Sequence, residues 1–232
     1  MLTLGPGLFE SAHGEYARTK ALTDPYPLSR RLRVMMTPRV TGLDPEIATG
    51  RVGEIFSETI RQFGTVSNFS RIMALAPGAL EAWMTANRGV RMRYLDEDEE
   101  FLKIEQAVII RTSSNNQSEY CLLHNIDLGA EAGLTAEQIR VIQAKDCDAA
   151  DILDERTKAA IAWADAVTEL RANGDEEGFK RMASLFSDQQ IVELTVLCCM
   201  WNFSNRFTEA LHIPLEPEGK RLRFRPLPAA AE

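Results

Sequence analysis

The chain of 232 residues has few cysteines and histidines, and it lacks the spacings that would pair them. Its four cysteines stand at positions 121, 147, 198 and 199, with no C-x-x-C pair, and its three histidines are far apart. These counts predict neither a disulfide framework nor a zinc-like site. We therefore expect reduced thiols, no metal and no cofactor, and a cytoplasmic location.

Long apolar runs and an excess of positive charge are missing as well. The longest nearly apolar run, Val196 to Phe203, is far shorter than the roughly 20 residues of a membrane-spanning helix. Met1 to Gly14 lack the basic start and apolar stretch of a secretory signal. The formal net charge of -8 argues against nucleic acid as a partner, because phosphate binding needs a basic surface. A small-molecule substrate is the partner that remains, with no membrane and no nucleic acid.

The composition is that of an ordinary globular protein, with 45% hydrophobic and 26% charged residues. Residues 1–43 are rich in glycine, proline and polar groups, and we interpret them as an N-terminal arm. Residues 44–216 carry helical periodicity and form the predicted domain. Residues 217–232 are a C-terminal tail, whose basic stretch Lys220 to Arg225 is expected to be solvated or to contact a neighbouring subunit.

The hydrophobic pattern predicts an all-α fold without strands. Asp44-Pro45 has the form of a helix start, and the helix is expected to bury a stripe that includes Ile60 and to end at Gly64. The acidic run at residues 96–100 begins a helix that continues to about Arg111. The polar cluster at residues 112–117 is then a break. Further helices are expected at 69–75, from Pro77, at 118–132, from the Thr135 capping box, at 153–172 and at 187–211.

One segment carries candidate chemistry, because it places a thiol and an imidazole three residues apart. Cys121 and His124 are expected on one face of a helix, with Cys121 in the first turn. The helix dipole and a nearby imidazolium would favour the thiolate there, and a neutral His124 could instead act as a base. The alternative is that Cys121 is a small core residue and His124 a hydrogen-bonded structural one.

Four pieces of sequence, in order, resemble the carboxymuconolactone decarboxylase and alkylhydroperoxidase (AhpD-like) superfamily. They are "LAPGALEAW", "QAVIIRTSSNNQSEYCLLHN", "GAEAGLTAEQI" and "WNFSNRFTEALHIPLEP", and together they span roughly residues 50 to 216. The resemblance implies an AhpD-like helical domain and a homo-oligomer, a trimer or a multiple of one, with active sites near subunit contacts.

The departures from the AhpD-like pattern bear on mechanism. Those relatives carry C-x-x-C followed by a histidine four residues later. Aligned through Gly133, Cys121 takes the second cysteine position, Ser118 the first, and Asn125 the position of the histidine. His124 stands one residue early, about 100° around a helix. A C-x-x-C disulfide cycle is therefore not available, although Cys198 or Cys199 could resolve an oxidised Cys121 if either lay near it.

Other polar residues complete the candidate site. The upstream glutamate of the family's proton relay aligns with Gln106, and Glu105 is its neighbour. Arg111 could bind a substrate carboxylate through two hydrogen bonds or could cap helix carbonyls. Glu119 could assist as a general acid or base or could be solvated. Ser118 and Asn125 are further candidates for substrate binding.

Three functions fit this sequence. The first is a cofactor-free lyase, decarboxylase or isomerase acting on a small carboxylated metabolite, with His124 shuttling a proton. The second is a thiol-dependent alkylhydroperoxide reductase, with Cys121 attacking the peroxide. The third is a non-catalytic member of the superfamily that binds a ligand or partner.

Overall fold

The computed structural model describes residues 37–144, 151–217 and 221–224, which are helical or irregular and contain no strand. Residues 1–36 of the predicted arm, Cys147 and the last eight residues lie outside the described residues. None of the described helices is long and apolar enough to cross a membrane. The elements, in order, are α3 (Gly50–Phe63), α4 (Asn68–Met73), α5 (Pro77–Val90), α6 (Glu99–Asn115), α7 (Glu119–Glu131), α8 (Ala136–Gln143), α9 (Glu155–Thr168), a short 3-10 turn (Ala172–Gly174), α10 (Glu176–Leu185) and α11 (Asp188–Leu211).

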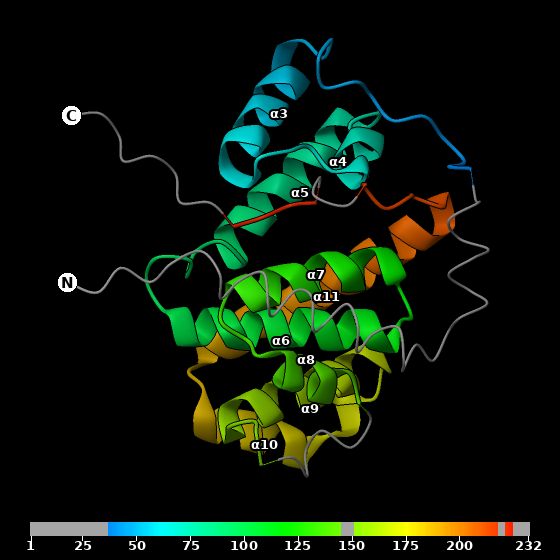
Figure 1. Ribbon diagram of the computed structural model, residues 1–232. Coiled ribbons are helices and arrows are strands. Elements are labelled where there is room, and N and C mark those ends of the chain that lie inside the picture. The colour runs from blue at the N-terminus through cyan, green and yellow to red at the C-terminus, as the bar shows by residue number, and fades with distance from the viewer. Residues whose placement is uncertain (1–36, 145–150, 218–220, 225–232) are drawn as a thin grey trace, which may run out of the picture. The chain divides into compact units, whose positions relative to one another are not determined.

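Helix α6 is the central element of the residues from Thr37 onwards, and it packs against α7, α8, α9 and α11 (Figure 1). Twelve of its 17 residues are buried, and these include Glu105, Gln106 and Arg111. A helix buried on nearly every side must find partners for its polar side chains, because an unpaired buried polar group is costly. Of these three residues, Gln106 accepts a hydrogen bond from Arg91, and Arg111 pairs with Asp165.

Several local signals in the sequence predicted their elements correctly. Pro77 occupies the first turn of α5, where its missing N–H costs nothing. Thr135 and Ser187 both form capping boxes, at the starts of α8 and α11. Gly64 ends α3 in the left-handed conformation, with φ of 79°. These signals act within a few residues, so they do not depend on the rest of the fold.

The predicted helix start at Asp44-Pro45 is wrong. Asp44 instead holds a turn, in which its carbonyl accepts from the N–H of Ala48 and its side chain accepts from Glu46 N–H. Helix α3 begins six residues later, at Gly50. Ile60 was expected in the buried stripe but is 46% exposed.

The predicted break at residues 112–117 is also wrong over most of its length, because α6 continues to Asn115. Its polar side chains find partners that do not compete with the helix. Thr112 Oγ1 donates to the carbonyl of Val108, and Ser113 Oγ donates to Asn205 Oδ1 on α11 at 3.3 Å. Tertiary contacts here override the weak helix propensity of serine and asparagine.

Helix α10 was not predicted, although Asp175 caps it by accepting from Gly178 N–H at 3.0 Å. The predicted helix at 153–172 is shorter than expected, since α9 ends at Thr168 and Asn173-Gly174 lie in the 3-10 turn. The predicted span of α11 is confirmed, and it supplies one wall of the candidate site.

Candidate functional site

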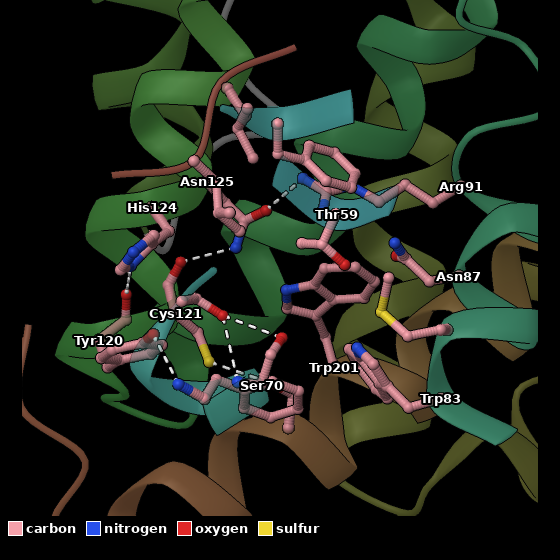
Figure 2. A pocket seen from close by; sticks show the side chains of 17 residues that line it. Thr59, Ser70, Trp83, Asn87, Arg91, Tyr120, Cys121, His124, Asn125 and Trp201 are labelled. Atoms are coloured by element: carbon pink, nitrogen blue, oxygen red, sulfur yellow. Dashed lines mark hydrogen bonds between the residues drawn. The ribbon is translucent and has the colours of Figure 1, made fainter. Parts of the chain in front are cut away.

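A cavity of about 70 Å³ lies beside Cys121 and His124 (Figure 2). Side chains of α3, α4, α5, α7 and α11 line it, together with one residue of the C-terminal segment. Helices α5 and α11 contribute large apolar side chains together with the polar Asn87 and Ser204, and α7 contributes mostly polar groups. The lining includes the aromatic side chains of Trp83 and Trp201 and the polar side chains of Arg91, Tyr120, Cys121, His124, Asn125 and Ser204.

Cys121 lies in the first turn of α7, as predicted, but its thiol is not activated in the way expected. The side chain is 3% exposed, and Sγ lies 3.3 Å from Ser204 Oγ and 3.7 Å from Thr208 Oγ1 on α11. Burial raises the pKa of the Cys121 thiol, and hydrogen bonds from Ser204, Ser118 and Thr208 offset this only in part. This environment opposes the thiolate that the first-turn position was expected to favour, and it favours the protonated thiol.

His124 lines the same cavity, but its ring turns away from the sulfur of Cys121 (Figure 2). Nδ1 lies 2.9 Å from the carbonyl oxygen of Tyr120, and Nε2 lies 2.7 Å from Oε2 of Glu216. Both neighbouring atoms are oxygens, although the contact between Nε2 and Glu216 does not have hydrogen-bond geometry. The spacing brought the two residues to one cavity without joining them by a hydrogen bond.

Glu216 is a functional candidate that the sequence analysis missed. Its Oε1 accepts from the Tyr120 hydroxyl at 2.8 Å and from the Asn68 N–H at 2.5 Å, while Oε2 faces His124. Burial alone would raise the pKa of Glu216, but the hydrogen bond and charge of His124, with these N–H and O–H donors, lower it. Tyr120 thus belongs to a buried polar cluster with Glu216 and His124.

The segment that follows α11 holds this cluster in place. Arg221 Nη1 donates to Asp127 of α7 at 3.0 Å, and Phe224 N–H donates to Glu131 at 2.7 Å. Leu222, between them, lines the cavity. Part of the basic stretch predicted to be solvated or to contact another subunit therefore contacts α7 of its own chain.

Arg91, the residue that follows α5, is the second candidate that the sequence analysis missed. It is 4% exposed and lines the cavity. Its Nη2 donates to Asn125 Oδ1 at 2.8 Å and to Gln106 Oε1 at 3.2 Å. Asn125 in turn donates from Nδ2 to the Cys121 carbonyl at 2.7 Å. Two residues predicted for substrate binding and proton relay, Asn125 and Gln106, thus position this arginine.

Glu105, the other relay candidate, is fully buried, and neither carboxyl oxygen has a hydrogen-bond partner among the described residues. Burial raises the pKa of Glu105 to about 9, against the opposing charge of Arg91. The carboxyl group is therefore neutral at pH 7. It does not line the cavity.

The structure places Arg111 outside the cavity, in a structural cluster. Its guanidinium contacts both carboxylate oxygens of Asp165, at 2.6 and 2.8 Å, and donates to the carbonyls of Ile142 and Ala144. Of the two roles weighed for Arg111, this geometry fits the structural one. The N–H groups of the Arg111 guanidinium donate to Asp165 on α9 and to backbone carbonyls at the end of α8.

Ser118 and Glu119 are beside the cavity, and neither lines it. Ser118 Oγ lies 3.1 Å from Thr208 Oγ1, and its side chain also hydrogen-bonds the Cys121 thiol. Glu119 is partly exposed at the first position of α7. Substrate binding by Ser118 and acid–base assistance by Glu119 therefore stay predictions.

The two cysteines of α11 have surroundings of their own. Cys198 is buried, with its sulfur near Thr112 Oγ1 and Thr168 Oγ1, and Cys199 is exposed. Neither lines the cavity. Nothing in the described ranges gathers three or more histidine, cysteine or acidic side chains as a metal site would.

Comparisons with known proteins identify the fold. The sequence matches no protein-family model, and it matches no curated protein. Solved structures do match. A peroxidase-related protein from Ralstonia eutropha JMP134, described as an alkylhydroperoxidase AhpD core, shares 18% identity at a TM-score of 0.65, over 79% of this chain and 94% of that one. A peroxidase-related protein from Silicibacter sp. TM1040 shares 20% identity at a TM-score of 0.65, over 80% and 97%.

A third similar structure is the debrominase Bmp8, with 20% identity and a TM-score of 0.63, over 76% of this chain and 91% of that one. A cysteine-to-alanine variant of Bmp8 has been solved with 2,3,4-tribromopyrrole. At these identities the comparisons establish the fold and leave the reaction open. The AhpD-like all-α fold expected from the sequence is confirmed.

Proposed function

We propose that this cavity is the active site of a cofactor-free enzyme that transfers a proton to or from a small carboxylated metabolite, as a lyase, decarboxylase or isomerase. The observation that carries the proposal is the state of Cys121. A buried thiol with a raised pKa, held by hydroxyl groups, suits a proton donor better than a resting nucleophile.

The cavity residues could carry out a decarboxylation. The bond between the carboxyl group and its neighbouring carbon breaks, carbon dioxide leaves, and the electron pair stays on that carbon. The Cys121 thiol gives its proton to the carbon, and the resulting thiolate accepts hydrogen bonds from the hydroxyls of Ser204 and Thr208 until solvent returns the proton.

His124 has a different role here from the shuttle expected at first. Nδ1 lies 2.9 Å from the Tyr120 carbonyl oxygen and Nε2 lies 2.7 Å from Glu216 Oε2. In this proposal the imidazole, held against the Glu216 carboxylate, is the group of the cavity wall that stabilises negative charge developing on the substrate. Glu216 and Tyr120 are positioning residues for it.

Proton transfer can be tested without knowing the natural substrate. We expect the enzyme in deuterium oxide to place deuterium on carbon in at least one member of a panel of small carboxylates, followed by NMR. Cys121→Ala should lower that exchange rate at least about 100-fold, the usual contribution of a positioned acid or base. Cys199→Ala, which alters an exposed thiol outside the cavity, is the matched control and should leave the rate unchanged. Equal exchange by wild type and Cys121→Ala would contradict the assignment.

The second candidate is a thiol peroxidase, favoured by the fold shared with proteins described as alkylhydroperoxidase and peroxidase-related. It requires Cys121 to become a thiolate and an external thiol to reduce the sulfenate that forms. If the carboxylates of the panel bind without deuterium exchange and Cys121 stays reduced under peroxide, a non-catalytic, ligand-binding function replaces both enzymatic candidates.

The homo-oligomer expected from the resemblance remains a prediction.

A further inference from the structure

Arg91 is a buried cation in the cavity wall whose hydrogen-bond partners are neutral. Its Nη2 donates to the amide oxygens of Asn125 and Gln106. Within residues 37–144, 151–217 and 221–224, no carboxylate forms an ion pair with it, Nη1 makes no hydrogen bond, and Nε is buried without one. A charge buried in this way is costly unless something compensates it.

Glu105, whose charge would act on Arg91, does not supply that compensation at neutral pH. Burial raises the pKa of Glu105 to about 9, so its carboxyl group is uncharged. Burial also lowers the pKa of Arg91 to about 10, which still leaves the guanidinium positive at pH 7. The interior therefore holds a positive charge at Arg91 whose counter-charge is not provided by Glu105.

Aromatic rings hold the guanidinium but do not neutralise it. Its central carbon lies 4.8 Å from the centroid of the Trp201 ring and 5.3 Å from that of Phe224. Figure 2 shows the Arg91 side chain extending towards Asn125, with the Trp201 indole beside it. Trp83 packs against Trp201, with centroids 5.8 Å apart, and extends the apolar wall. The cavity thus offers one cation next to an apolar, aromatic surface.

We propose that Arg91 is the anion-binding residue of the cavity and that its ligand is a small carboxylate, whose apolar part lies against Trp83 and Trp201. This assigns the residue that binds the carboxylate of the substrate, and it rests on the proposed function. A guanidinium matches a carboxylate in geometry and charge. The cavity is small, at about 70 Å³, and this favours a compact acid. The carboxylate lies at Arg91, and the reacting carbon faces Cys121.

The test compares propionate with propionamide, which has nearly the same shape and no charge. The chain has three tryptophans, and their indole N–H signals in NMR report on binding. Trp83 and Trp201 line the cavity, whereas Trp163 donates to Thr195 Oγ1 at 2.9 Å outside it and serves as the internal control. We expect propionate to shift the Trp83 and Trp201 signals in a saturable way, to leave Trp163 unmoved, and to bind at least tenfold more tightly than propionamide.

The variant Arg91→Gln should weaken propionate binding at least tenfold and leave propionamide binding unchanged. Equal affinities for the two probes, no shift with either, or full propionate binding by a folded Arg91→Gln protein would each overturn the proposal. If Arg91→Gln does not fold, the comparison of the two probes on the wild type decides alone.

Binding and exchange separate this inference from the proposed function. Propionate bound through Arg91, with no deuterium exchange on any carboxylate, would leave the anion site standing and remove the enzyme activity. Deuterium exchange that depends on Cys121 but not on Arg91 would support the enzyme activity and remove the anion site at Arg91.

Discussion

Replacing Glu216 by alanine is expected to lower the free energy of unfolding by about 3–5 kcal/mol at pH 7, the usual cost of removing one partner from a buried ion pair. The carboxylate contacts His124 and accepts hydrogen bonds from Tyr120 and Asn68. Its loss leaves two donors and an imidazole without a partner in the interior. Urea unfolding at pH 7 measures the change. Glu54→Ala, which removes an exposed partner of Arg51, is the control and should cost less than about 1 kcal/mol.

The effect of Glu216 should depend on pH in a defined direction. Because the pKa of Glu216 in the folded protein lies below its ordinary value of 4.5, its stabilisation is present above that value and is lost as pH falls through the folded pKa. The difference in unfolding free energy between wild type and Glu216→Ala should therefore narrow as the pH falls below 4.5. A gap that stays constant down to pH 3 would show that the carboxylate charge contributes nothing to stability.

Replacing Glu105 by glutamine is expected to act in the opposite direction and to raise the free energy of unfolding by about 2–3 kcal/mol at pH 7. The pKa of Glu105 rises on folding from 4.5 to about 9. Its stability contribution is complete below 4.5 and is lost as pH rises through the folded value, because the unfolded chain loses the proton first. Glutamine keeps the shape of the protonated side chain and has no proton to lose.

Two controls identify the origin of that gain. Wild type and Glu105→Gln should have the same stability at pH 4, where Glu105 is protonated in both the folded and the unfolded chain. Glu100→Gln, on the exposed side of the same helix, should change stability little at either pH. Denaturant unfolding at pH 4, 7 and 8 gives the comparison. A Glu105→Gln protein that is less stable than wild type at pH 7 would mean that Glu105 is charged and paired in the folded state.

Local signals accounted for most of the fold. Capping boxes at Thr135 and Ser187 and the glycine at position 64 each act through their immediate neighbours, so the helices they bound were predicted. The errors arose where distant residues decide. Helix α6 continues to Asn115 because α11 and α9 supply partners for its polar end, such as Asn205 for Ser113 and Asp165 for Asn115.

The site divides in the same way. Helical spacing predicted that Cys121 and His124 would share a cavity, because three residues bring side chains to one side of a helix. Helical spacing could not show that the carboxylate of Glu216, 92 positions further along the chain, would lie against the imidazole of His124. Nor could it show that Arg91, which follows α5, would hydrogen-bond Asn125 on α7. The raised pKa of Cys121 depends on burial beneath α11, which the first-turn argument did not include.

The measurement that tests the account most directly is the pH profile of Cys121 alkylation, followed by mass spectrometry, with the exposed Cys199 as internal reference. The position of the midpoint, which does not depend on how accessible the thiol is, gives the thiolate pKa. We predict a midpoint for Cys121 above the ordinary value of 9.0 and no sulfenate at Cys121 after mild peroxide. A midpoint below neutral pH, with sulfenate formed at Cys121, would contradict the proton-donor role and establish the thiol as a nucleophile.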